Sequence, residues 1–131
     1  MLSLMLKMCL AGQPCKEVRV ADFFTAQAGF MCEYNREGMQ ESATREKRPG
    51  TFSCKAGLAE EKLTPLATLN FKVCVASGTP GEQCDGFALA QFYGAEYAEP
   101  ACAKNADHLR PALEKAAGGT HARVKLDCFS N

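Results

Sequence analysis

Eight cysteines are the residues of this 131-residue chain most able to do chemistry. Thiolates can bind zinc or iron–sulfur clusters, exchange electrons, or pair as disulfides. The chain has no CxxC spacing, which zinc ribbons and redox sites usually need, whereas an even count spread along a short chain is typical of a disulfide framework. We therefore predict disulfides, with a metal-binding thiol protein or free structural thiols as alternatives, for this set: Cys9, Cys15, Cys32, Cys54, Cys74, Cys84, Cys102 and Cys128.

Other side chains give little sign of catalysis. His108 and His121 are the only histidines, and both are expected at exposed positions in a helix start and a turn. Glu60 and Glu61 are interpreted as a solvated face, and the basic residues of segment 45–48 as the charged end of a helix. There is no GxSxG, HExxH, Walker or GxGxxG motif. We expect no enzyme activity, no cofactor, no metal and no small-molecule substrate.

The composition indicates a folded chain without a strong overall charge. Hydrophobic residues make up 47% of the sequence, and 15 basic residues balance 15 acidic ones. This balance argues against nucleic acid as a partner, because binding to phosphates depends on basic residues. No run of eighteen apolar residues is present, so no membrane span is expected.

The apolar N-terminal stretch from Leu2 to Leu10 could be mistaken for part of an export signal. Lys7 interrupts it, and no small-residue cleavage site follows before Cys15. The octapeptide LMLKMCLA instead matches LNFKVCVA, residues 69–76, in which the Leu, Lys, Cys and Ala coincide. We therefore interpret the stretch as a core strand and expect no signal peptide in this chain.

The match extends along the sequence. The intervals between successive cysteines contain 5, 16 and 21 residues in the first half and 9, 17 and 25 in the second. VADFF in the first half corresponds to LAQFY in the second. We predict a tandem duplication, with a first four-cysteine module over residues 1–57, a connector over 58–66 and a second module over 67–131.

Alternating apolar residues predict a strand in each octapeptide, over 4–11 and 69–76. A Gly/Pro turn leads into a second strand, as in a hairpin, and a short strand ends each half, over 51–55 and 123–129. The predicted fold class is α+β: two tandem small disulfide-stapled modules, each strand, strand, helix, strand.

A helix is predicted after the third cysteine of each half. In the second half Asp107 is the expected N-cap, Pro111 would lie in the first turn, and Gly118 would end the helix. In the first half residues 33–47 have a helical composition, with Met39 and Ala43 as the apolar face.

Each module allows three disulfide connectivities if pairs stay within it. We favour the first cysteine with the fourth and the second with the third, because the first and last strands can be neighbours. The alternation counts against this choice, since Cys9 lies on the Lys7 face of its strand and Cys54 on the Phe52 face. The connectivity therefore stays open.

Six aromatic residues are more than two small cores require. Packing between the modules is one explanation, and a contact surface for a partner protein is the other. The candidate partner-binding residues are Phe23, Phe24, Phe30, Phe92, Tyr93 and Tyr97.

The segment LMLKMCLAGQPCKEVRVADFF, followed by Cys32 and RPGTFSC, resembles a group of short, uncharacterised four-cysteine proteins of alphaproteobacteria and their phages. The resemblance covers about half of the chain, which has two copies of the module and lacks a tryptophan before the fourth cysteine. It implies a source and a structural class, and no catalytic activity.

Two functions follow as expectations. The first is a non-catalytic structural or attachment protein, most concretely a capsid-decorating or tail-associated component of a phage or phage-like particle, with other proteins or its own copies as partners. The second is a secreted disulfide-rich binding protein, an inhibitor or effector. Either would place the chain in a virion or another oxidising extracellular environment.

Overall fold

The computed structural model describes residues 1–56, 63–76, 78–94, 96–117 and 123–130. Within these residues, strands and helices follow one another in the same order in each half of the chain. The elements are β1 (Leu2–Met8), β2 (Lys16–Phe23), α1 (Ala28–Arg45), β3 (Thr51–Ala56), β4 (Ala67–Val75), β5 (Gln83–Phe92), α2 (Ala98–Ala117) and β6 (Arg123–Ser130).

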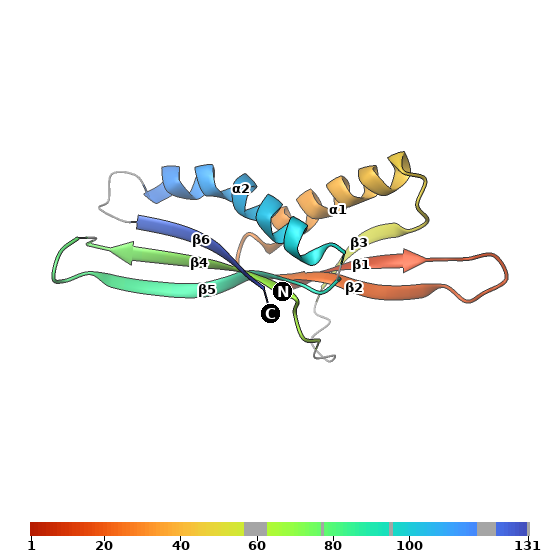
Figure 1. The fold of residues 1–131 in the computed structure, drawn as a ribbon, viewed down its shortest axis with the longest axis horizontal. Coiled ribbons are helices and arrows are strands. Elements are labelled where there is room, and N and C mark those ends of the chain that lie inside the picture. Colours follow the sequence, from red (N-terminus) through yellow and green to blue (C-terminus); the bar gives the residue numbers. More distant parts are fainter. Residues whose placement is uncertain (57–62, 77, 95, 118–122, 131) are drawn as a thin grey trace.

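All the strands join one antiparallel sheet in the order β3-β1-β2-β5-β4-β6. The order reads the same way from both edges: a hairpin and its last strand on one side, and the equivalent three strands on the other. Both helices cover one face of this sheet (Figure 1). The predicted α+β class is confirmed, and the two segments predicted as modules share a single sheet.

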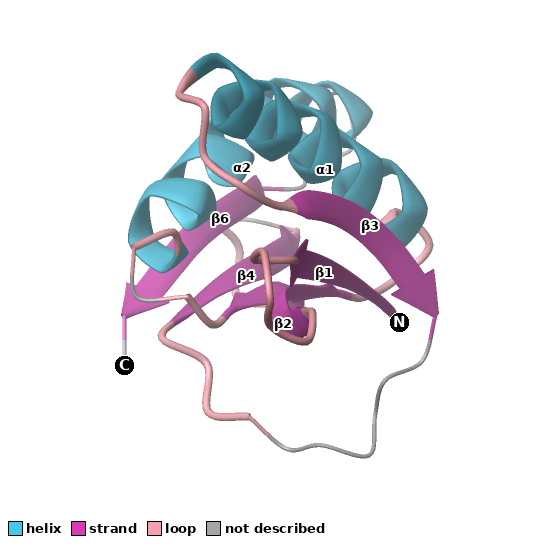
Figure 2. Cartoon of the chain, turned by 90° about the vertical axis from the view of Figure 1, so that its right-hand side faces the viewer, coloured by secondary structure: helices cyan, strands magenta, loops and turns pink. Residues whose placement is uncertain are grey.

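The core lies between the sheet and the helices, as the alternation in the octapeptides predicts. Leu4 and Leu6 of β1 and Leu69 of β4 are buried in one hydrophobic cluster that also contains residues of both helices. Figure 2 shows the two helices on the same side of the twisted sheet. The opposite face carries the alternating polar residues.

Each hairpin contains an irregularity at an equivalent position. The register shifts between Leu4 and Met5 in the first hairpin and between Leu69 and Asn70 in the second. The shifts leave Val20 and Leu89 as extra residues on β2 and β5, and both side chains are buried. A bulge bends and twists its strand, so the matched bulges curve both hairpins in the same way.

Several predicted boundaries are wrong. Strand β1 begins at Leu2, where the apolar stretch begins, but residues 9–11 lie beyond its end, and β4 begins two residues before the predicted segment 69–76. Helix α1 begins at Ala28 rather than near residue 33. The last strands are close to their predicted ranges, at Thr51–Ala56 and Arg123–Ser130.

Helix α2 departs furthest from the prediction. It begins at Ala98, so Asp107 lies inside it and is not its N-cap. The carbonyl of Gly94 accepts hydrogen bonds from the N–H groups of Tyr97 and Ala98, which starts the first turn upstream of the cysteine. Pro100, rather than Pro111, lies in the first turn of the helix, and Pro111 lies in the helix interior. The predicted end at Gly118 falls outside the described residues.

The favoured disulfide connectivity is wrong. The first cysteine pairs with the second and the third with the fourth: Cys9–Cys15, Cys32–Cys54, Cys74–Cys84 and Cys102–Cys128. Cys74 and Cys84 are direct cross-strand partners, because the hairpin register brings them face to face. Cys54 lies opposite Leu4 on the helix-facing side, where Cys32 of α1 reaches it. The strand alternation that counted against our choice was the correct signal.

The predicted connector, residues 58–66, is described only from Leu63 onward. The N–H of Leu66 donates to the carbonyl of Phe92, which ties the end of the connector to the centre of the sheet. Glu60, Glu61 and His121 lie outside the described residues. Within the described ranges, no helix is long and apolar enough to cross a membrane.

Candidate functional site

Two of the six candidate aromatic residues cannot form a partner surface. Phe23 and Phe92 have no exposed surface, and their rings meet edge to face with centroids 6.0 Å apart. They come from β2 and β5, the two strands that join the halves of the sheet. Packing between the halves, the other explanation, accounts for this pair, and their assignment as partner-binding residues is wrong.

The other four aromatic residues lie nearer the surface. Phe30 of α1 is 61% exposed, whereas Phe24, Tyr93 and Tyr97 are partly buried. The hydroxyl of Tyr97 accepts a hydrogen bond from Arg48, and that of Tyr93 donates to Asp22. Phe30 is therefore the member of the set best exposed for contact with another molecule.

A buried polar cluster lies on the helix-free face of the sheet. Asp22 accepts hydrogen bonds from Ser3, Arg19 and Tyr93, at 2.5, 3.2 and 2.5 Å. The Arg19 and Asp22 side chains are only 5% and 4% exposed, so the ion pair is almost fully desolvated. Burial, and then the hydrogen bond to Asp22, raise the pKa of Tyr93 above its ordinary value of 10.0. Because Asp22 is fully engaged, the cluster is suited to fixing the sheet centre rather than to proton transfer.

A second buried polar pair lies between the helices. Asn35 of α1 and Asn105 of α2 exchange two side-chain hydrogen bonds, each 2.8 Å long. Their remaining amide protons go to the carbonyls of Met31 and Ala101, one helical turn earlier. Sequence reasoning missed this pair, although an asparagine follows the third cysteine by three residues in both halves, in CEYN and CAKN.

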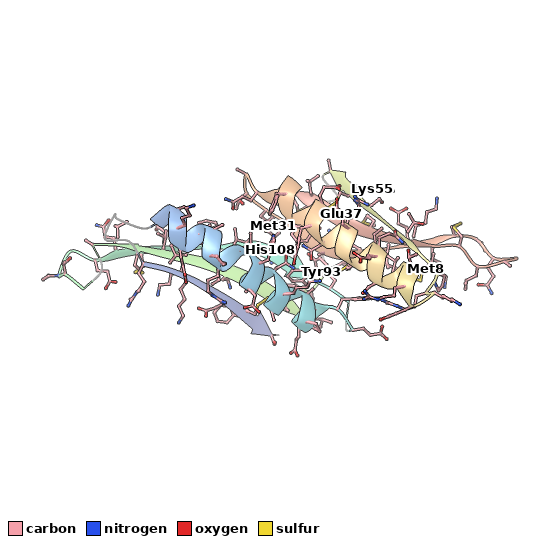
Figure 3. All side chains as sticks on the ribbon, turned by 90° about the horizontal axis from the view of Figure 1, so that it is seen from above. Met8, Met31, Glu37, Lys55, Tyr93 and His108 are labelled. Atoms are coloured by element: carbon pink, nitrogen blue, oxygen red, sulfur yellow. A yellow bond between two sulfur atoms is a disulfide. The ribbon has the colours of Figure 1, made fainter. Side chains whose placement is uncertain are left out.

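The seam between the helices is filled differently on its two sides. On one side His108 of α2 stacks on Tyr34, with ring centroids 3.8 Å apart, and more loosely on Phe30, at 5.9 Å. Figure 3 shows the helices from above, running in opposite directions with His108 between them. On the other side lies an open pocket of about 220 Å³, bounded by Gly38, Met39, Tyr97, Pro100 and Lys104 among others.

The two hairpins extend to opposite ends of the molecule (Figure 1). A disulfide closes each of them close to its turn, Cys9–Cys15 in one and Cys74–Cys84 in the other. Equivalent apolar residues near these disulfides are strongly exposed. They are Leu10 and Val18 in the first hairpin, and Val75 and Phe87 in the second.

Among the residues that the structure describes, one further cluster has the spacing of a metal site. Cys74, Glu82 and Cys84 lie close enough together to hold an ion, but both sulfurs are bonded to each other and lack the thiolate that a metal needs. In the basic segment 45–48, Arg48 pairs with Glu46 and donates to Tyr97, which ties the segment after α1 to the residue before α2.

Comparison of the chain with protein-family models, curated proteins and solved structures finds no significant match.

Proposed function

We propose that the chain is a non-catalytic structural and attachment protein, and most concretely an accessory, capsid-decorating or tail-associated component of a phage or phage-like particle. The observation that carries the proposal is the pair of disulfide-closed hairpins at opposite ends of the molecule, each with two exposed apolar residues at equivalent positions. A surface that occurs twice suits a partner that also repeats its binding surface, as a particle wall or tail does.

Rigidity supports an attachment role for the hairpins. A flexible loop loses conformational entropy when it binds a partner, and this loss weakens the association. A hairpin closed by a disulfide is already ordered, so it loses less conformational entropy on binding. Exposed Leu, Val and Phe side chains on such a support are typical of contact surfaces. The strands at the sheet edges, β3 and β6, are less suited to contact, since the exposed Lys55 of β3 and Arg123 and Lys125 of β6 disfavour pairing with another strand.

A tandem duplication is part of the proposal, and the register at the centre of the sheet supports it. Ala21 pairs with Phe92, Asp22 with Gln91, and Phe23 with Ala90. If VADFF and LAQFY are equivalent, this register is unchanged when the halves exchange places. The Asn35–Asn105 pair has the same property. The arrangement corresponds to a two-fold homodimer whose subunits have been joined in one chain.

Mass spectrometry of purified particles tests the particle assignment directly. We expect this chain among the proteins of virions or phage-like particles made by cells that carry its gene. Particles that lack the chain, although the cells express it, would contradict the assignment.

Variants of the hairpins test the attachment surface separately. Leu10→Ser with Val18→Ser, or Val75→Ser with Phe87→Ser, should lower the amount of chain retained on purified particles, and the four changes together should lower it most, because two linked contacts reinforce each other. Thr79→Ser, at the exposed turn of the second hairpin, is the control. Unchanged retention of the fourfold variant would exclude the hairpins as the attachment surface.

The secreted binding protein remains the second candidate, because disulfides are typical of oxidising compartments and all eight cysteines are paired. An in-frame export signal upstream in the gene would favour it. The metal-binding alternative predicts free thiols in denatured, unreduced protein, and the paired sulfurs argue against it.

A further inference from the structure

The pocket between the helices exists because the two sides of the seam carry different residues. Gly38 and His108 each follow the third cysteine of their half by six residues. His108 places a ring on Tyr34 on its side of the seam, whereas Gly38 supplies no side chain, and an open pocket lies there beside Gly38 and the end of Lys104. The positions equivalent to Phe30 and Tyr34 are Pro100 and Lys104. A planar ring is thus present on one side and missing on the other.

The walls of the pocket suit a flat apolar group. Met39 and Tyr34 come from α1, and Pro100 and Ala101 come from α2. Asn35 is a buried polar residue of the lining, and both of its amide protons are already bonded within the protein, to Met31 and to Asn105. A ring can therefore lie against Asn35 without leaving a buried donor unpaired.

Two cationic side chains and one carboxylate line the pocket, and Lys104 is the cation without an ion-pair partner among the described residues. Its ammonium group lies 5.9 Å from the Tyr34 ring centre and 3.6 Å from the position that a Cβ on Gly38 would occupy. Arg48, at the other end, is held by Tyr97 and Glu46. Glu96 is the acidic group of the lining, and it lies eight residues before Lys104, ahead of the first residue of α2.

We propose that this pocket binds a small planar aromatic carboxylate. The ring lies beside Gly38 and takes the place that the His108 ring takes on the other side of the seam, and the carboxylate pairs with the ammonium of Lys104. Lys104 can also face the ring, as it faces Tyr34. The proposal is independent of the hairpin surfaces and of the particle assignment.

Titration with benzoate and indole-3-acetate, followed by amide NMR shifts of the intact disulfide-bonded chain, tests the site. We expect saturable shifts at Gly38 and at the side-chain amides of Asn35 and Asn105 for at least one probe, with a Kd below about 1 mM. Cyclohexanecarboxylate, which has no flat ring, and benzamide, which has no charge, should bind at least fivefold more weakly. Equal binding of either control, or no saturable shift with either probe, would overturn the proposal.

Two substitutions locate the ligand. Gly38→His supplies the missing ring from the protein and should weaken binding at least tenfold, while the added Cβ meets only the flexible end of Lys104. Lys104→Gln should weaken binding of the carboxylates about fivefold to tenfold and leave benzamide unaffected. The matched controls are Gly29→His, an exposed position of the same helix, and Lys115→Gln on α2. Unchanged affinity in Gly38→His, with the fold verified by circular dichroism, would place the probe elsewhere and contradict the proposal.

Discussion

At the scale of single residues, two sets of buried polar groups mark the middle of the molecule, one on each side of the sheet. Asn35 and Asn105 lie among the helices, and the Arg19–Asp22 ion pair lies on the helix-free face. Among the described residues, no buried side-chain nitrogen or oxygen lacks a hydrogen-bond partner. Such satisfied networks are expensive to disturb, because removing one member leaves the other buried and unpaired.

Asn35→Ala should lower the free energy of unfolding by about 1–3 kcal/mol, because the amide of Asn105 loses both of its bonds to Asn35. Urea unfolding measures the change. The double variant Asn35→Ala with Asn105→Ala should lose less free energy of unfolding than the sum of the two single variants, because each single variant leaves its partner amide buried and unpaired. Asn70→Ala, on the helix-free face, is the control. Additive losses in the double variant would contradict the pairing.

Tyr93 predicts a loss of stability in alkaline solution. Its pKa is raised in the folded protein, so the folded chain holds the phenol proton after the unfolded chain has released it. The contribution is complete below pH 10, the ordinary pKa, and declines as the pH rises above that value toward the folded pKa. Short-exposure unfolding measurements between pH 8 and about pH 11 should show this decline, and Tyr93→Phe should reduce it. An ultraviolet titration step at pH 10.0 that disappears in Tyr93→Phe would contradict the raised pKa.

At the scale of elements, the strands follow from the sequence far better than the helices. Alternation of Leu4, Leu6 and Met8 is a local signal, and the sheet retains it. The start of α2 depends on Gly94 and on Pro100 in the first turn, and a sequence with Pro111 further along offered a second, equally regular starting point. The prediction of the disulfide connectivity was wrong because it relied on which strands are neighbours. The face of the strand on which each cysteine lies is a better guide to its partner.

The two kinds of disulfide should differ in what they contribute. Cys32–Cys54 and Cys102–Cys128 join a helix to a strand across sequence separations of 22 and 26, whereas Cys9–Cys15 spans 6. Loop-closure entropy predicts a loss of about 3.4 kcal/mol when Cys32 and Cys54 are both replaced by alanine, against about 2.2 kcal/mol for Cys9 and Cys15. Chemical unfolding of the two variants measures the difference. A larger loss for the hairpin pair would show that strand strain or packing, rather than chain entropy, governs these bonds.

At the scale of the whole molecule, β2 and β5 make the two halves one structure. One hydrophobic cluster contains residues of both halves, and Phe23 and Phe92 meet inside it. The sequence indicated two repeated segments and more aromatic residues than two small cores require. It did not show that Phe23 and Phe92 would pack against each other and join the two segments. The pocket could not be foreseen either, because it depends on which helix faces lie opposite each other.

The shared core predicts a single unfolding transition. Calorimetry should show one cooperative peak, and Phe23→Ala should cost about 3–5 kcal/mol and shift that whole peak to lower temperature. Phe92→Ala should act in the same way, since it removes the other ring of the pair. Phe30→Ala, at an exposed position, serves as the comparison. Two separate peaks, of which each variant moves only one, would contradict a common core.

The central register of β2 with β5 carries a consequence for how the chain can evolve. In a dimer of identical subunits, any residue on the symmetry axis faces its own duplicate, so a buried carboxylate there would meet a second one. Here the axial pair is Asp22 with Gln91. Arg19 forms the ion pair with Asp22 and Tyr93 donates a hydrogen bond to it, and the residues aligned with these two are Ala88 and Phe24. If the halves arose by the duplication proposed above, their linkage in one chain frees the axis from self-complementarity, and a single buried ion pair can lie where two-fold symmetry would place two carboxylates side by side.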